Sequence, residues 1–262
     1  MIYHIYSKDE IKERPQRKNV YLESYLIDES SPFVIVCPGG AYKFVSDSNE
    51  GRPFAEKLNK AGFNAFVLFY SVGPGNARYP HPLEDLARAI NYIKYHASDF
   101  GIDADDFALM GSSAGGHLCA IFCTEYEKYE GEYNGQKYNL KPNVLMLTYP
   151  LISMENPTHK ESLKNFLGLF PGEKDRKKAS VEYLVRKDFP ATFIWHNKDD
   201  NSVCPDNSIK LKEALDKIGI KNELLLYVSG GHGIGLAEGK DAEGWIDKAI
   251  NFLKDNMKNE AP

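Results

Sequence analysis

The stretch that decides the fold is Phe107-Ala108-Leu109-Met110-Gly111-Ser112-Ser113-Ala114-Gly115-Gly116-His117-Leu118. An apolar run of strand length leads into Gly-x-Ser-x-Gly, and residues of helical pattern follow it. A sharp turn from strand to helix lifts a serine hydroxyl above the sheet, and flanking glycines remove the Cβ atoms that would collide there. Ser113 is therefore the candidate nucleophile, at a helix N-terminus whose free N–H groups can stabilise developing negative charge. Because Gly-x-Ser-x-Gly also occurs by chance in turns that merely start a helix, the interpretation depends on the rest of the chain.

On both sides of this stretch, apolar runs rich in β-branched residues alternate with longer segments of helical period. The expected strands are residues 20–27, 33–37, 65–70, 107–110, 144–149, 192–196 and 223–228. The expected helices are residues 52–61, 83–96, 114–123, 207–218 and 242–256. This alternation predicts an α/β fold, with a mostly parallel twisted sheet and helices on both of its faces.

One long connection interrupts the alternation. Residues 152–190 lie between two expected strands and contain a short amphipathic piece around Leu163, Phe166 and Leu167. We interpret this segment as a small cap-like insertion over the edge of the sheet. No internal repeat, low-complexity tract or linker divides the sequence, so a single domain over residues 1–262 is expected.

Composition restricts the class of protein and its partners. The 262 residues are 42% hydrophobic and 26% charged, as in ordinary globular proteins. The net charge is −5 without a dense basic run, so nucleic acid is not an expected partner. Charged residues follow the start closely and no apolar stretch approaches about 18 residues, so we expect neither export nor a membrane anchor. The four cysteines form no disulfide or metal pattern, and a cytoplasmic location is expected.

A glycine-rich loop follows the expected strand 33–37, in the segment Cys37-Pro38-Gly39-Gly40-Ala41-Tyr42. Consecutive small residues let backbone N–H groups approach a reacting carbonyl oxygen. We assign the oxyanion hole to the N–H of Gly40 or Ala41 together with the N–H of Ala114. Taken alone, the loop would be better explained as an ordinary Pro-Gly-Gly turn.

An acid and a base complete the set, and each follows an expected strand. The loop 197–203 offers two carboxylates, of which Asp200 is the first choice and Asp199 the alternative for orienting an imidazole. His232 lies between glycines after the last strand and is the candidate base. The chain order Ser113, Asp200, His232 is the one expected of an α/β-hydrolase.

The chain resembles the α/β-hydrolases, and more narrowly the bacterial acetyl esterases and acetylxylan-esterase-like carbohydrate esterases. The stretches that carry the resemblance are residues 38–42, 79–85, 111–118, 199–203 and 230–233, within a region that runs from about residue 33 to the end. The resemblance implies a serine carboxylesterase that hydrolyses short, acetyl-type esters, including those of sugars, through an acyl-enzyme. It implies no cofactor and no metal, and Tyr42 becomes a candidate substrate-binding residue.

The sequence departs from related esterases at two places. Pro38 and Ala41 stand where lipase and esterase branches carry the first histidine and the last glycine of His-Gly-Gly-Gly. Alanine keeps its N–H, so the hole survives if the backbone φ at Ala41 is allowed. Cys204 precedes Pro205, where relatives often have Val-Pro directly, and this bears on the orientation of Asp200.

The same three residues are compatible with other functions, because they do not encode the leaving group. A related amidase, peptidase or lipase is one alternative, and a hydrolase-fold binding protein without chemistry is another. The expected partner is a small-molecule ester, such as an acetylated sugar. The sequence leaves the oligomeric state open, a homodimer included.

Overall fold

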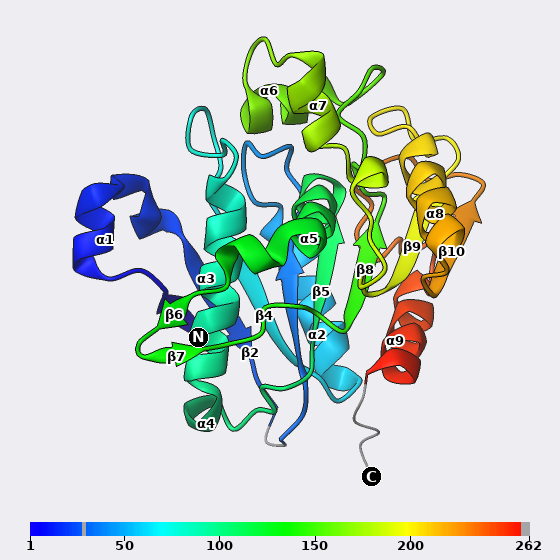
Figure 1. The fold of residues 1–262 in the computed structure, drawn as a ribbon. Helices are drawn as coiled ribbons and strands as arrows, with labels where there is room; N and C mark the ends of the chain where they lie inside the picture. Colours follow the sequence, from blue (N-terminus) through cyan, green and yellow to red (C-terminus); the bar gives the residue numbers. More distant parts are fainter. Residues whose placement is uncertain (28–29, 258–262) are drawn as a thin grey trace.

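An eight-stranded twisted sheet runs through the centre of the molecule (Figure 1), in a computed structural model that describes residues 1–27 and 30–257. The strand order is β1-β2-β4-β3-β5-β8-β9-β10. The six strands from β4 to β10 are parallel, while β1 and β2 form an antiparallel edge. The strands are β1 (Ile2–His4), β2 (Tyr21–Tyr25), β3 (Phe33–Cys37), β4 (Asn64–Phe69), β5 (Phe107–Ser112), β8 (Val144–Thr148), β9 (Ala191–Asn197) and β10 (Asn222–Tyr227).

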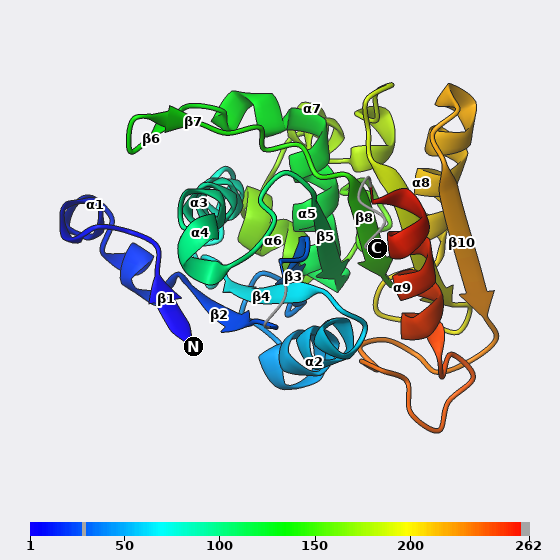
Figure 2. The same ribbon diagram turned by 90° about the horizontal axis from the view of Figure 1, so that it is seen from below.

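Helices cover both faces of this sheet, as Figure 2 shows. One face carries α3 (His81–Tyr95), α5 (Ser113–Glu125) and α8 (Asp206–Ile218), and the other carries α2 (Arg52–Lys60) and α9 (Trp245–Asn256). Alternate side chains of each central strand enter opposite cores, so that Phe33 and Ile35 pack under α3 and α5, while Val34 and Val36 pack under α2. The predicted α/β fold with a mostly parallel sheet is confirmed.

The register of the parallel strands brings their carboxyl ends together at one edge of the sheet. Gly111 of β5 pairs with Cys37 of β3, and Ser112 pairs with Thr148 of β8. The loops that leave these strands therefore start side by side, and this edge is where an α/β sheet places its ligands.

The segment 152–190 lies over this edge (Figure 1), where it connects β8 to β9. The predicted amphipathic piece forms α6 (Lys160–Leu167), with Leu163 and Phe166 buried, and is followed by α7 (Glu173–Lys178) and η4 (Val181–Tyr183). Asn165 Nδ2 donates to the carbonyl oxygen of Ala41 at 2.9 Å, so α6 is attached to the glycine-rich loop after β3. We refer to residues 152–190 as the inserted segment.

Several short elements were not expected from the pattern. These are β1, α1 (Lys8–Glu13), η1 (Pro15–Asn19), η2 (Asp47–Gly51), α4 (Ala97–Phe100), η3 (Tyr126–Tyr129), β6 (Glu132–Tyr133), β7 (Gln136–Lys137), α7 and η4. Most are too short to show a hydrophobic period, and α7 consists of charged residues alone. Elsewhere the expected bounds differ from the observed ones by a few residues.

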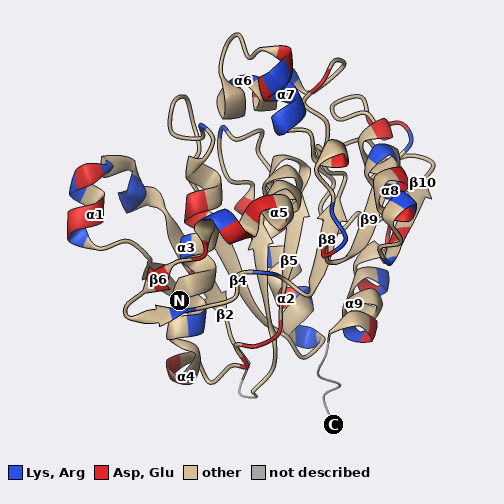
Figure 3. Ribbon diagram, in the orientation of Figure 1, with Lys and Arg blue, Asp and Glu red and all other residues tan. Residues whose placement is uncertain are grey.

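Charges of both signs are carried by surface helices such as α1 and α8 (Figure 3). Within residues 1–27 and 30–257, no helix has the length and apolar character that a bilayer-crossing segment needs.

Candidate active site

Ser113 sits on a tight turn between β5 and α5. Its φ is 50°, in the left-handed region that non-glycine residues rarely adopt. A Cβ atom on Gly111 would lie 2.4 Å from the Gly115 carbonyl oxygen, and one on Gly115 would lie 2.0 Å from that of Cys37. The glycines of Gly-x-Ser-x-Gly are therefore required by the close approach of backbone to backbone, which is the reason the sequence suggested.

His232 reaches Ser113 from the loop after β10. Its Nε2 is 2.8 Å from Ser113 Oγ, and its Nδ1 is 2.6 Å from Asp200 Oδ2. Since an ionised carboxylate can only accept, Nδ1 carries the proton and Nε2 is left to accept from the Ser113 hydroxyl. The imidazole is thus held in the tautomer that a general base requires.

Asp200 is buried and held by four donors. Its Oδ2 accepts from His232 and from Nε2 of His196, which is 3.0 Å away, while Oδ1 accepts from the backbone N–H groups of Ser202 and Val203. Burial acts to raise the pKa of Asp200, but the hydrogen bonds from His196 and His232 outweigh it and hold the pKa well below its usual range. The carboxylate therefore stays charged beside the imidazole.

Asp199 makes a different set of contacts. Its carboxylate accepts from the backbone N–H groups of Gly230 and Gly231, at 2.9 to 3.1 Å, and these bonds lower its pKa. It therefore holds the loop that carries His232 without touching the imidazole, and the contacts of the two neighbouring acids favour Asp200 for orienting it.

The glycine-rich loop, residues 37–42, lies beside Ser113. Ala41 adopts a φ of 57°, so the alanine accepts the left-handed conformation that a glycine would take more readily. Among the described residues, the N–H groups of Gly40 and Ala41 have no protein acceptor. Ala114 is in the first turn of α5, where N–H groups have no acceptor one turn earlier in the helix. These three residues can supply donors to a ligand oxygen.

Tyr42 does not face this space. Its side chain is fully buried, its hydroxyl is 2.8 Å from Nδ1 of His117, and its ring stacks on Phe166 of α6. The expectation that its side chain binds substrate is corrected: an aromatic residue directly after the loop is used to pack the inserted segment onto the core.

Three further polar residues lie beside the site, and sequence patterns did not single them out for it. His196 holds Asp200, while Glu50 of η2 accepts from the Gly39 N–H at 2.7 Å. His159 begins α6, and its Nδ1 accepts from the N–H of Ser162. Burial lowers the pKa of His159, and the charge of nearby His232 acts in the same direction. These contacts span only 3 to 11 residues, but none of them belongs to a motif with a recognisable spacing.

The comparison with family models decides the family. The BD-FAE family model matches residues 19–215, which contain Ser113 and Asp200. The chain belongs to the BD-FAE family. Its curated relatives include endo-1,4-beta-xylanase B of Butyrivibrio fibrisolvens, with 30% identity over 87% of this chain, and the acetylxylan esterase of Xylanibacter ruminicola, with 33% identity over 77%. The chain spans only 36% and 41% of the length of these two relatives.

Solved structures also resemble this BD-FAE chain. The acetyl ester-xyloside bifunctional hydrolase of Caldicellulosiruptor lactoaceticus matches with a TM-score of 0.84 and 32% identity, over 90% of this chain and 88% of that one. The α/β-hydrolase fold is therefore confirmed, and the proteins that this chain resembles include ones named as esterases and acetyl ester hydrolases.

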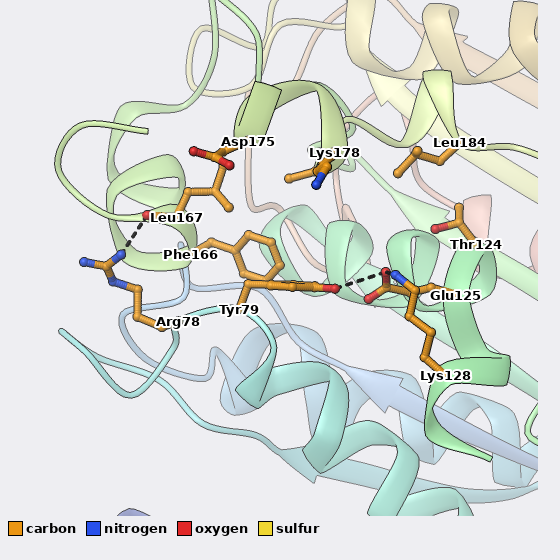
Figure 4. A pocket seen from close by; sticks show the side chains of 11 residues that line it. Arg78, Tyr79, Thr124, Glu125, Lys128, Phe166, Leu167, Asp175, Lys178 and Leu184 are labelled. Carbon is orange, nitrogen blue, oxygen red and sulfur yellow. Dashed lines mark hydrogen bonds and ion pairs between the residues drawn. The ribbon is translucent and has the colours of Figure 1, made fainter. Parts of the chain in front are cut away.

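A cavity of about 560 Å³ lies in the BD-FAE chain at the far end of α5 from Ser113. In Figure 4 the Tyr79 hydroxyl points to Glu125, while Lys178 and Leu184 of the inserted segment line the opposite wall. Glu125 is twelve residues after Ser113 on one helix, which corresponds to about 18 Å along its axis. This cavity is therefore separate from the candidate active site.

Proposed function

We propose that this chain is a serine carboxylesterase that hydrolyses short, acetyl-type esters, with Ser113 as nucleophile, His232 as general base and acid, and Asp200 as the orienting acid. The observation that carries the proposal is the His232 imidazole, which bridges Ser113 Oγ at 2.8 Å and Asp200 Oδ2 at 2.6 Å. Both distances are within the range for proton transfer without rearrangement. No cofactor takes part in this chemistry.

Acylation starts when His232 Nε2 takes the hydroxyl proton and Ser113 Oγ attacks the ester carbonyl carbon. The carbonyl oxygen becomes an oxyanion, and the N–H groups of Gly40, Ala41 and Ala114 are the proposed donors to it. The imidazolium then gives its proton to the alcohol oxygen as the C–O bond breaks. The alcohol leaves, and the acyl group remains on Ser113.

Deacylation repeats these steps with water. His232 takes a proton from the water, the hydroxide oxygen attacks the acyl carbon, and the proton returns to Ser113 Oγ as the carboxylic acid departs. Asp200 stays ionised throughout and stabilises the imidazolium each time it forms, as its lowered pKa supports.

The substrate class is proposed from the relatives. Two of them are named as hydrolases of acetylated xylan or of acetyl esters and xylosides. An acetylated xylose-type sugar is therefore the proposed substrate. We further propose that residues 1–262 form one domain in which the inserted segment is a small cap, since α6 packs on the glycine-rich loop.

Hydrolysis rates on p-nitrophenyl esters, from acetate to long acyl chains, test the proposal, with Ser113→Ala as control and acetylated xylo-oligosaccharides as the next substrates. We expect a serine-dependent rate that is highest for acetate. A maximum at long chains would indicate a lipase. No serine-dependent rate on any ester, with Ser113 unlabelled by a fluorophosphonate, would indicate a binding protein; labelling without ester hydrolysis would redirect the search to amides.

A further inference from the structure

Glu50 is a buried carboxylate beside the nucleophile that the proposed triad does not use. Its side chain belongs to η2 and is only 3% exposed. A Cβ atom placed on Gly39 would lie 2.7 Å from Glu50 Oε2 and 3.0 Å from Ser113 Cβ. The carboxylate and the nucleophile therefore flank the same point of the glycine-rich loop.

Both carboxylate oxygens of Glu50 accept hydrogen bonds. Oε2 accepts from the Gly39 N–H and Oε1 accepts from the Tyr149 hydroxyl, each at 2.7 Å. The Tyr149 hydroxyl itself accepts from the Gly235 N–H at 3.3 Å, so its own proton is free to point at Glu50. An arrangement in which both oxygens accept is the one an ionised carboxylate makes.

This charge has no cationic side chain beside it in the resting state. Among the residues that the structure describes, no lysine or arginine forms an ion pair with Glu50. Burial raises the pKa of Glu50, while the bonds from Tyr149 and Gly39 and a positive charge on His232 act to lower it. A buried charge without a partner is costly, and its natural complement here is the imidazolium that forms only during the reaction.

Glu50 and its neighbour also connect the loops on either side of the nucleophile. The Tyr149 ring lies edge-on to the His232 ring, with centroids 4.8 Å apart, and its backbone holds a φ of 36° that is rare for an aromatic residue. Asn49 Nδ2 donates to the Gly233 carbonyl oxygen at 2.7 Å. The glycine-rich loop, the Tyr149 turn and the His232 loop therefore all meet at η2.

Titratable groups from the neighbouring elements surround His232 and Glu50. His232 is faced by Asp200, by Ser113 and, from the inserted segment, by His159. Glu50 is faced by Tyr149 and Tyr70. Burial raises the pKa of Tyr70, and the charge of Glu50 raises it to a lesser extent. Asp47 lies on the same short helix as Glu50. Within this group only Asp200 and Glu50 are placed to oppose the charge of a protonated His232.

We propose that Glu50 is a positioning residue of this site: its carboxylate fixes the Gly39 loop and the Tyr149 ring, and its negative charge stabilises the His232 imidazolium, against which the Tyr149 ring packs. The inference rests on the proposed esterase function, because it assigns a role within that reaction. It adds a second buried carboxylate to the three residues of the triad.

Glu50→Gln removes the charge but keeps the shape. The Gln carbonyl can still accept from Gly39, and its amide can donate to the Tyr149 hydroxyl. With p-nitrophenyl acetate between pH 5 and 9, we expect kcat to fall about 10- to 100-fold with KM changed less than about twofold. We also expect the acidic limb of the kcat/KM profile to move about half a pH unit or more to lower pH, because the imidazolium loses a stabilising charge.

Glu125→Gln is the matched control. Glu125 is also a buried carboxylate bound by tyrosine hydroxyls, those of Tyr79 and Tyr129, at the other end of α5, but it differs from Glu50 in pairing with Lys128. This variant should keep the wild-type kcat and pH profile. If Glu50→Gln matches Glu125→Gln in both, while the wild-type rate depends on Ser113, the inference is overturned and the proposed function stands. No serine-dependent rate in the wild type overturns both.

Tyr149→Phe is a second test of the proposal, to be used if circular dichroism shows that Glu50→Gln does not fold. It retains the ring against His232 but removes one donor from Glu50, which should then protonate at higher pH. Protonation of Glu50 takes away the charge that stabilises the imidazolium, so we expect the acidic limb of its profile to move to lower pH, as in Glu50→Gln but by less, with kcat lowered only about 3- to 10-fold. An unmoved acidic limb in this variant contradicts the proposal.

Discussion

The edge of the sheet that carries Ser113 and the inserted segment above it are built in different ways. Ser113, Asp200 and His232 each follow a strand of the central sheet, and short hydrogen bonds link all three. The inserted segment is joined to the core by buried apolar side chains such as Phe166 and by hydrogen bonds such as the one from Asn165 to Ala41. The three candidate residues thus stand directly after strands of the sheet, whereas the inserted segment reaches the same edge through a long connection of short helices.

Removing the reacting groups should give the largest effect. Ser113→Ala and His232→Ala are each expected to lower kcat by about 10⁵- to 10⁶-fold, with the double variant scarcely worse, because the residues act as one unit. Steady-state kinetics on an acetate ester measures this. Losses that multiply in the double variant would show that the two residues act independently.

Substitutions of the two neighbouring acids, Asp199 and Asp200, should differ in their effects on kcat. Asp200→Asn is expected to lower kcat by about 10⁴-fold, because the imidazole loses the partner that fixes its tautomer. Asp199→Asn should lower kcat less than about tenfold, since Asp199 holds only the backbone of the His232 loop. Rates for both variants at one pH measure the contrast, and a larger loss at Asp199 would overturn our assignment.

The pH dependence of the free energy of unfolding tests the contact between His117 and the inserted segment. It is fully buried, and burial lowers its pKa to about 4, against about 6.5 in an unfolded chain. The unfolded chain therefore takes up the proton first as the pH falls. The stability that this neutral histidine provides is complete above about pH 6.5 and is lost as the pH drops towards 4, by about 3 kcal/mol in all.

Urea unfolding of the wild type and His117→Gln at pH 7 and pH 4.5 measures this effect. The wild type should lose about 2 to 3 kcal/mol more than the variant between the two pH values. His96→Gln, at a partly exposed histidine, serves as control and should follow the wild type. Equal losses in His117→Gln and the wild type would refute the assignment.

Two contacts between α6 and the glycine-rich loop should give the smallest effects. Asn165→Ala removes a buried hydrogen bond and should lower the free energy of unfolding by about 1 kcal/mol. Lys43→Met breaks an ion pair with Glu161 whose side chains are 59% and 48% exposed, so its effect should stay within about 0.5 kcal/mol. Urea unfolding at pH 7 compares the two, and a larger loss at Lys43 would reverse their ranking.

Sequence reasoning succeeded where the backbone geometry is set by neighbouring residues. Gly111 and Gly115 bracket Ser113 because any Cβ there would collide, and that requirement is visible in the sequence itself. It was wrong for the side chain of Tyr42, since position after a loop does not reveal which way a side chain turns. It missed α7, whose six charged residues have no apolar period.

The sequence by itself determined the strand–helix alternation, the nucleophile turn and the order of the three candidate residues, because each is specified by neighbours within a few positions. Only the tertiary structure decided that Asp200 rather than Asp199 lies against His232, that Tyr42 turns into the core and that Glu50 lies behind Ser113. Glu50 and Tyr149 are 99 residues apart, yet they share one hydrogen bond. Contacts of that kind depend on the register and packing of the whole sheet, and no local pattern of residues encodes them.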